Sequence, residues 1–314
     1  MEEPAKLAQT LDLFFRDPTA TAFPPLESPF AEQLLEGIPA GHPLRDHVLR
    51  FARDGYTVVD LAISDFDAIA SRIIRDLAPR YPSGNRRVQE AWMFHEDVRA
   101  LACTPKILEL LAALYQREPI PFQTLNFDVG TEQATHSDVL HFYSEPARYM
   151  CGVWVALEDM DAENGPLHYY PGSHRLPDYD LADLGMARGF EDYSRYEHFI
   201  AALARAHRLE RKELYVKKGH ALIWAANLLH GGSPVKDPRR TRQSQVTHYF
   251  FSNCVWWTPG DSDLIVGKPQ LREVVDLKSG RLLKPRHHGK PVDLSNFENV
   301  YRYPRPLPEW VKPE

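Results

Sequence analysis

Hydrophobic and polar positions divide the chain into a helical first part and a strand-rich second part. From position 121, short runs rich in β-branched and aromatic residues alternate with turn residues, which predicts strands. The predicted strands are 122–129, 139–142, 150–157, 167–170, 221–224 and 245–252. Because helices do not alternate with these runs, the pattern disfavours a parallel α/β fold and favours a sandwich or barrel.

The first part of the chain combines helical spacing with a single strand. Residues 55–60 read as a strand, and the stretch Ser64-Asp65-Phe66-Asp67 predicts the start of a helix that runs to about 78. A second helix is predicted after Thr104 and Pro105, because leucine and isoleucine recur there at helical spacing. A charged helical insertion at about 190–214 interrupts the predicted strands.

Proline marks both ends of the predicted domain. Residues 1–45 are rich in proline and predict an arm over the surface with at most short helices. The main domain is expected at 46–255. After Trp257 the chain is polar and proline-rich again, which predicts an irregular C-terminal extension, 256–314, packed on the same domain.

Composition is that of a globular chain of 314 residues, with 43% hydrophobic and 25% charged residues. The net charge of −6 makes nucleic acid an unexpected partner, and no apolar run is long enough for a membrane span, so no membrane partner is expected either. The sequence shows no secretory signal, and its three cysteines form no C-x-x-C pair. We expect a cytoplasmic location, and the sequence leaves the oligomeric state open.

The first candidate chemistry is a histidine and a carboxylate two positions apart, His136 and Asp138. On a strand these side chains share a face and can bind one cation. His95 and Asp97 have the same spacing, but in a helical stretch such positions diverge by about 200°. His230 follows an apolar run and precedes two glycines, which places it at a strand end. One carboxylate and two imidazoles form the facial triad of non-haem Fe(II) oxygenases.

An arginine-rich stretch precedes the last predicted strand. An iron centre of this kind needs an electron donor, and 2-oxoglutarate can serve if a cation holds its far carboxylate. Arginine suits that role because its planar fork binds a carboxylate through two hydrogen bonds. Arg242 and Ser244 share a side of an extended segment and are the candidates, with Arg240 as the alternative arginine. A solvated basic loop is the competing interpretation.

In combination, these motifs resemble the phytanoyl-CoA dioxygenase family of Fe(II)- and 2-oxoglutarate-dependent oxygenases. The resemblance covers about 49–252, and the motifs in family order are His136-x-Asp138, Asn164-Gly165-Pro166, Pro171-Gly172-Ser173-His174, His230-Gly231 and Arg242. It implies a mainly β fold with flanking helices, built on a double-stranded β-helix (jelly roll, cupin-like). It also implies His136, Asp138 and His230 as catalytic iron ligands.

The same resemblance implies three cofactors or cosubstrates, Fe(II), 2-oxoglutarate and O2, with release of succinate and CO2. Arg242 would clamp 2-oxoglutarate, although it lies one residue further from His230 than is usual in the family. Counting back from His248 and Tyr249 favours Arg242 over Arg240. Gln123 resembles a glutamine that helps bind 2-oxoglutarate in the related ectoine hydroxylases. The expected reaction is hydroxylation of a C–H bond in a small or medium organic substrate.

Five residues are candidates for substrate contact: Tyr143, Trp154, Trp224 and Asn227, which flank the predicted ligands in sequence, and His168, on the strand that follows Asn164 and Gly165. The alternative is packing of the β core, or for His168 a hydrogen-bonded position in the core. The insertion at 190–214 joins two strands whose ends lie near the predicted iron, so we expect it to act as a lid. Two other functions stay open. A jelly-roll binding module without turnover would keep the same residues, and a zinc-dependent hydrolase would use the same ligands.

Overall fold

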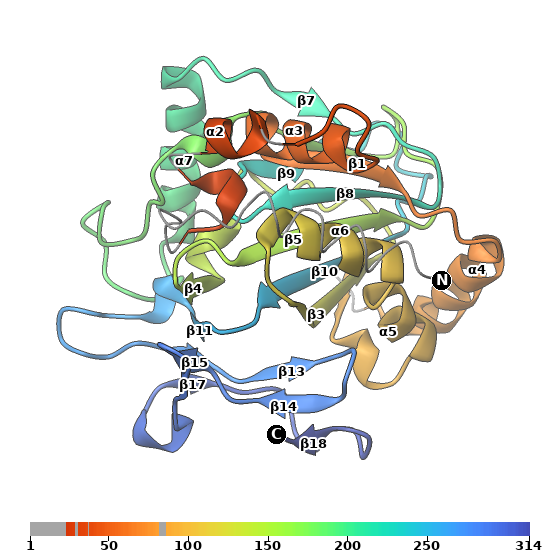
Figure 1. Cartoon of the computed structure of the whole chain (residues 1–314). Coiled ribbons are helices and arrows are strands. Elements are labelled where there is room, and N and C mark those ends of the chain that lie inside the picture. The colour runs from red at the N-terminus through yellow and green to blue at the C-terminus, as the bar shows by residue number, and fades with distance from the viewer. Residues whose placement is uncertain (1–22, 29–30, 37, 82–85) are drawn as a thin grey trace.

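An antiparallel sheet of six strands forms the centre of the molecule (Figure 1). The computed structural model describes residues 23–28, 31–36, 38–81 and 86–314. Every neighbouring pair of strands in the sheet is antiparallel. In sheet order the strands are β1 (Tyr56–Asp60), β8 (His220–Ala225), β5 (Met150–Ala156), β10 (Ser244–Phe251), β3 (Pro119–Phe127) and β2 (Arg87–Gln89).

Two smaller sheets lie across a cavity from this central sheet. The first contains β7 (Lys212–Glu213), β6 (Leu167–Tyr169) and β9 (His230–Gly232), and the second contains β17 (Val300–Tyr301), β12 (Leu271–Arg272), β11 (Val255–Trp257) and β4 (Tyr143–Glu145). Side chains of the central sheet and of both smaller sheets line the same cavity. Sheets that face each other in this way, antiparallel except for the parallel pair β12 and β17, form the predicted double-stranded β-helix.

Helices cover the other face of the central sheet. Their apolar residues, such as Phe51, Ile73 and Leu110, join Val153 and Ile223 of the sheet in the largest hydrophobic cluster. These helices are α2 (Ala31–Glu36), α3 (Arg45–Asp54), α4 (Phe66–Leu77), α5 (Glu96–Ala102) and α6 (Pro105–Tyr115), with the 3₁₀ helices η1 (Pro25–Glu27), η2 (Ala78–Arg80) and η3 (Ala91–Met93). None of the helices in the described ranges is long and apolar enough to span a membrane.

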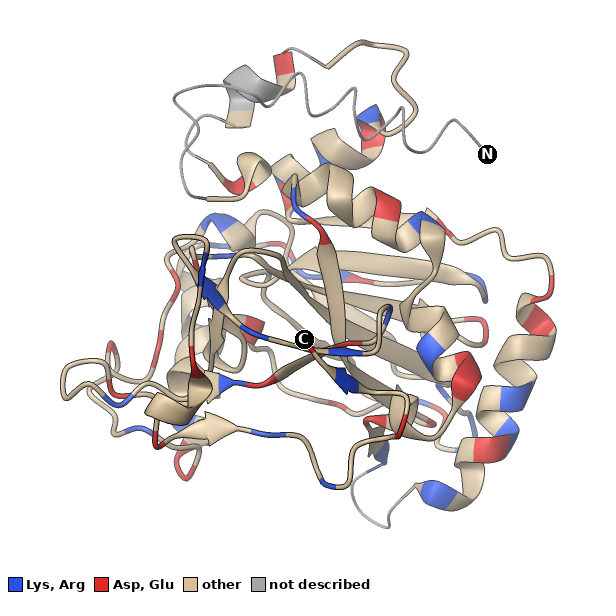
Figure 2. Ribbon diagram, turned by 60° about the horizontal axis from the view of Figure 1, so that its bottom comes forward, with Lys and Arg blue, Asp and Glu red and all other residues tan. Residues whose placement is uncertain are grey.

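The predicted insertion forms one helix, α7 (Tyr193–Ala206). Tyr196 and Ile200 of this helix are buried together with Leu140, Leu181 and Leu229 in a separate hydrophobic cluster. The helix therefore packs on the segments that carry Asp138 and His230. Figure 2 shows basic and acidic residues interspersed on the helices and connecting segments, while the strands of the central sheet carry few of either.

The C-terminal extension is more regular than predicted. Besides β11, β12 and β17 it contains β13 (Val274–Asp276), β14 (Arg281–Leu283), β15 (Arg286–His287), β16 (Lys290–Pro291), β18 (Lys312–Pro313), η6 (Pro259–Asp261) and η7 (Leu294–Asn296). Val274, Val275, Leu277 and Tyr303 belong to the largest hydrophobic cluster. The prediction of an irregular tail was wrong because short strands paired with distant segments leave little pattern in a polar, proline-rich sequence.

The predicted strand at 139–142 is also wrong. This segment begins with the 3₁₀ helix η4 (Asp138–Leu140), and the Ser137 hydroxyl accepts a hydrogen bond of 3.4 Å from the Val139 amide. Local capping therefore outweighs the β-branched composition of the run. Another 3₁₀ helix, η5 (Ser173–Arg175), begins within the motif Pro171-Gly172-Ser173-His174. Of the predicted N-terminal arm, residues 1–22, 29–30 and 37 lie outside the described residues, and the rest contains short helices as expected.

Candidate active site

His136, Asp138 and His230 come together in one buried cluster. One ligand atom from each lies within 4.8 Å of the other two. Asp138 Oδ1 is 3.7 Å from His136 Nε2 and 3.9 Å from His230 Nε2. A metal ion with bonds of about 2 Å to nitrogen and oxygen can reach all three atoms from one point. Among the described residues this is the only cluster of its kind.

Backbone pairing brings the two histidines together from distant parts of the chain. The amide of each donates to the carbonyl of the other, at 2.9 and 3.0 Å, and the Asp138 amide donates to the Ala226 carbonyl at 3.1 Å. The Nδ1 atom of His136 lies 3.0 Å from the Ala134 carbonyl, and that of His230 lies 2.9 Å from the Leu228 carbonyl. A carbonyl can only accept, so both Nδ1 atoms carry the proton and each Nε2 atom keeps the lone pair that a metal would bind. That of His136 lies 3.3 Å from the side-chain nitrogen of Gln133, which a metal ion would have to displace.

A tryptophan orients the carboxylate of the cluster. Trp224 Nε1 donates to Asp138 Oδ2 at 2.8 Å, which leaves Oδ1 toward the histidines. The Trp224 indole lies over Gly152 of the neighbouring strand, and a Cβ atom there would be 2.1 Å from the ring. The indole therefore fits at this position only because Gly152 has no side chain.

Electrostatics keep the cluster in a metal-binding protonation state. Burial lowers the pKa of His136 to about 3, and the neighbouring His230 adds to this effect. Burial alone would raise the pKa of Asp138, but His230, His248, His136 and the Trp224 hydrogen bond together lower it to about 2. At neutral pH Asp138 is therefore ionised and His136 is neutral, as metal coordination requires.

The cluster opens into a cavity of about 360 Å³, within the size range of small-molecule sites. Arg242 lines it, is 1% exposed, and donates from Nη1 to the Gly165 carbonyl at 3.3 Å. Burial lowers the pKa of Arg242 to about 10, so its guanidinium is still charged at neutral pH. Its Nε atom has no hydrogen-bond partner. Arg240 instead forms an ion pair of 3.1 Å with Asp161 and does not line the cavity.

The other predicted 2-oxoglutarate residues differ in position. Gln123 lines the cavity, and its Oε1 lies 2.9 Å from His248 Nδ1. Ser244 is fully buried and its hydroxyl has no hydrogen-bond partner, but it is not among the residues that line the cavity. Two buried polar groups without partners, on Arg242 and Ser244, therefore lie two residues apart at the start of β10.

Of the five predicted substrate residues, the structure places two in the cavity, Trp154 and Trp224. The Tyr143 hydroxyl donates to Asp178 at 2.7 Å, and His168 Nε2 lies 2.8 Å from the Thr135 hydroxyl. Neither of these two side chains lines the cavity, and neither does Asn227. The predicted substrate contacts of these three side chains therefore do not lie in this cavity.

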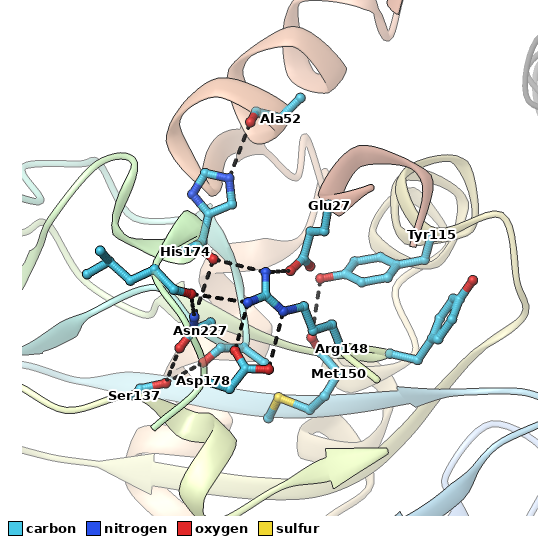
Figure 3. Close-up of polar contacts among 12 residues, drawn as sticks. Glu27, Ala52, Tyr115, Ser137, Arg148, Met150, His174, Asp178 and Asn227 are labelled. Carbon is cyan, nitrogen blue, oxygen red and sulfur yellow. Dashed lines mark hydrogen bonds and ion pairs between the residues drawn. The ribbon is translucent and has the colours of Figure 1, made fainter. Parts of the chain in front are cut away.

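Asn227 belongs instead to a network that supports the metal cluster (Figure 3). Ser137, between two of the cluster residues, donates to Asn227 Oδ1 at 3.1 Å. Asn227 Nδ2 donates to the Leu176 carbonyl at 2.6 Å. Arg148 donates to the same carbonyl at 3.1 Å and to Asp178 at 2.9 Å. The loop that carries His136 and Asp138 is thus tied to the turn at 174–178.

The structure also adds cavity residues that sequence reasoning missed, among them His141, Phe142, Phe190, Tyr193 and Arg272. His141 could have been proposed from the sequence, because it lies only three residues after Asp138. Phe190 and Tyr193 belong to the predicted lid at 190–214. Arg272 lies beyond the region of family resemblance, so no motif indicated it.

The fold and the site define a jelly-roll protein with a buried His-Asp-His cluster able to hold one metal ion. The model of the phytanoyl-CoA dioxygenase (PhyH) family matches residues 51–243, and the chain belongs to this family. This confirms the resemblance inferred from the motifs.

Two curated relatives have related names. The mouse "Phytanoyl-CoA dioxygenase domain-containing protein 1" is 33% identical over 190 residues, which are 59% of this chain and 63% of the relative. The bovine "Phytanoyl-CoA dioxygenase, peroxisomal" is 29% identical over 201 residues, 58% of this chain and 56% of the relative. The match therefore spans less than two thirds of either relative.

Solved structures share the fold. The epimerase SnoN, in complex with Fe³⁺, alpha ketoglutarate and nogalamycin RO, matches with a TM-score of 0.55 and 22% identity, over 68% of this chain and 85% of its own. EctD from S. alaskensis, with 2-oxoglutarate and 5-hydroxyectoine, matches with a TM-score of 0.51 and 21% identity, over 88% of each chain. At these identities the matches establish the double-stranded β-helix.

Proposed function

We propose that this chain is an Fe(II)- and 2-oxoglutarate-dependent oxygenase that hydroxylates a C–H bond of a small or medium organic molecule. The observation that carries the proposal is the combination of His136, Asp138 and His230 with a buried, unpaired Arg242 in one cavity. Membership of the PhyH family supports it. Two fold neighbours, SnoN in complex with Fe³⁺ and alpha ketoglutarate and EctD with 2-oxoglutarate, agree with the same cofactors.

The side chains of the cluster fit Fe(II). Two neutral imidazoles and one carboxylate on one side of an ion leave its remaining coordination positions open toward the cavity. Fe(II) would supply the redox chemistry that couples oxidation of 2-oxoglutarate, giving succinate and CO2, to oxidation of the substrate by O2. The protein's part is to fix the ligands through the Ala134, Leu228 and Trp224 hydrogen bonds and to exclude water.

Arg242 fits the far carboxylate of 2-oxoglutarate. A buried guanidinium without a counter-ion is costly, and a bidentate carboxylate would satisfy it. The Ser244 hydroxyl, two residues after Arg242 at the start of β10, is a further hydrogen-bond donor in this region. Gln123 lines the same cavity, where its side chain is hydrogen-bonded to His248 and to Glu90.

The same residues distinguish the oxygenase from two other candidate functions. A zinc-dependent hydrolase could use the metal cluster but has no use for an unpaired arginine that awaits a second carboxylate. A binding module without turnover would bind a ligand and release no succinate. The buried Arg242 favours the oxygenase over both.

The test is a screen of organic compounds for succinate formation that depends on Fe(II), 2-oxoglutarate and the compound, repeated under ¹⁸O2. The proposal expects one labelled oxygen atom in succinate and one in a hydroxylated product. Products without added oxygen, from epimerisation or ring closure, would keep the oxygenase class and overturn hydroxylation. A product whose new oxygen comes from water, without succinate, would identify a hydrolase.

A further inference from the structure

A second buried arginine, Arg272, lines the cavity. Arg242 lies 5.8 and 5.9 Å from the rings of Phe127 and Trp154, which pair with Ser244 and Val246 at the start of β10. Arg272 lies 4.8 Å from the ring of Phe142, which in turn contacts His248 in the middle of β10. The two guanidinium groups therefore contact different side chains of one cavity.

Arg272 is held in place but forms no ion pair. It is 5% exposed, donates from Nη1 to the Thr258 hydroxyl at 2.9 Å, and lies 4.0 Å from the ring of Tyr301. Its Nε atom has no hydrogen-bond partner. Within the described part of the chain, no carboxylate lies within 4.0 Å of it.

Glu90 and Asp261 attract Arg272 electrostatically, but no nearby carboxylate forms an ion pair with it. Glu273, the next residue, pairs with Arg302 at 3.4 Å and with Arg305 at 2.8 Å. The buried Glu90 accepts hydrogen bonds from the Trp92 indole and from the Thr124 amide. Asp261 lines the cavity without forming an ion pair to Arg272. The fold thus leaves a desolvated cation facing the cavity, an arrangement that costs free energy unless an anion binds there.

We infer that Arg272 binds a carboxylate of the organic substrate, so that the substrate class is a small carboxylic acid with an apolar body. This inference rests on the proposed function, in which Arg242 is already occupied by 2-oxoglutarate. The guanidinium fork binds a planar carboxylate through two hydrogen bonds. Phe142, Phe190 and Tyr193 line the same cavity and offer apolar and aromatic contacts for the rest of the molecule.

The cavity volume limits the size of that acid. About 360 Å³ must hold both 2-oxoglutarate and the substrate's reacting part, so the acid enclosed there is small. Arg272 stands on β12, beyond residues 51–243 that match the family model. The residue that selects the substrate would therefore come from the C-terminal extension, while the metal and 2-oxoglutarate residues come from the matched region.

The test compares acids with their neutral isosteres on the intact protein, loaded with Fe(II) and 2-oxoglutarate without O2. Phenylacetate, hydrocinnamate and octanoate are titrated by calorimetry beside their primary amides. We expect at least one of these acids to bind about tenfold or more tightly than its amide, because only the acid forms charge-assisted hydrogen bonds. If none of the acids binds better than its amide, the inference is wrong.

Substitutions test whether Arg272 is the source of the preference for the acid. Arg272→Gln should abolish the preference for the acid, while the matched control Arg240→Gln, on a surface ion pair, should keep it. If Arg272→Gln does not fold, the comparison of acid and amide on the unmodified protein decides. If Arg272→Gln folds and keeps the preference, the inference is overturned.

Titration with 2-oxoglutarate separates this inference from the proposed function. If Arg242→Gln loses 2-oxoglutarate binding and Arg272→Gln keeps it, the two arginines have the assigned roles. If Arg272→Gln alone loses it, Arg272 is the 2-oxoglutarate clamp and the inference fails. If the unmodified protein binds no 2-oxoglutarate, the proposed function itself is wrong.

Discussion

Trp224 and Trp154 lie in the same cavity on neighbouring strands but differ in what their indole nitrogens contact. Trp224 Nε1 donates to Asp138 at 2.8 Å, whereas Trp154 Nε1 has no hydrogen-bond partner. Trp224→Phe should therefore weaken metal binding by about tenfold or more, the usual effect of losing a partner of a metal ligand. Calorimetry with Mn(II) measures this, and Trp154→Phe is the matched control. Equal losses in both variants would assign the effect to packing instead.

Arg242 and Arg240 provide a second pair of residues with different surroundings. Lysine at 242 keeps the charge but loses the fork, so Arg242→Lys should raise the KM for 2-oxoglutarate by about tenfold or more. Arg240→Lys should leave that KM unchanged, because Arg240 pairs with Asp161 away from the cavity. Steady-state succinate formation measures both. An effect confined to the Arg240 variant would mean that the assigned register is wrong.

At the scale of residues, the sequence indicates groups whose spacing is set by local geometry. His136, Asp138 and His230 could be proposed because a strand places positions i and i+2 on one face and because glycines follow His230. Asn227 and Tyr143 could not be placed, since their hydrogen bonds depend on the turn at 174–178, brought close only by the fold. Arg272 had no motif at all, although it is among the most buried charges.

The predicted role of helix α7 as a lid can be tested by substitution, because residues at its start line the cavity. Phe190, just before it, and Tyr193, in its first turn, line the cavity, and the Tyr193 hydroxyl lies 3.1 Å from His141 Nε2. The lid remains a proposal that these contacts support. Phe190→Ala and Tyr193→Ala should each lower kcat/KM for the organic substrate by about tenfold, the loss of an aromatic contact. Both should leave the KM for 2-oxoglutarate nearly unchanged.

The control for α7 is His198→Ala, an exposed position on the same helix that does not line the cavity. If all three variants keep the kcat/KM of the unmodified protein, or if they change only its oligomeric state, α7 is not a lid.

At the scale of elements, long segments with a regular hydrophobic period could be predicted from the sequence. Segments whose structure depends on a local cap or on pairing with distant strands could not. The helix at 66–77 and the strands β5 and β10 lie within one or two residues of their predicted positions. The segment 139–142 was misread because Ser137 caps a turn there. The strands of the C-terminal extension were missed because their partners lie far away in sequence, as in the pairing of Leu271 with Trp257 and Val300.

For the molecule as a whole, a buried ionic cluster joins the N-terminal segment to the network around the metal loop. Glu27 lies 3.5 Å from Arg148, which also binds Asp178 (Figure 3). Burial raises the pKa of Glu27 to about 8, although Arg148 opposes this shift. The folded chain therefore holds a proton that the unfolded chain releases near pH 4.5. The contribution of this group to stability is full below that pH and is lost as pH rises through about 8.

The resulting prediction concerns stability against pH. The free energy of unfolding of the unmodified protein should fall relative to that of Glu27→Gln as pH rises from about 4.5 to 8, by an amount on the order of a few kcal/mol. Urea unfolding at several pH values measures the difference, and Glu36→Gln, at an exposed position, is the control. Parallel profiles for the unmodified protein and Glu27→Gln would contradict the assigned protonation.

The most direct test of the central claim is the stoichiometry of Fe(II) and 2-oxoglutarate binding without O2. The metal-free protein is titrated with Fe(II), and the iron-loaded protein is then titrated with 2-oxoglutarate. The account predicts one Fe(II) and one 2-oxoglutarate per chain, loss of iron binding in Asp138→Ala, and loss of 2-oxoglutarate binding but not of iron binding in Arg242→Gln. Iron binding by Asp138→Ala at unchanged affinity, or no 2-oxoglutarate binding to the iron-loaded protein, would contradict it.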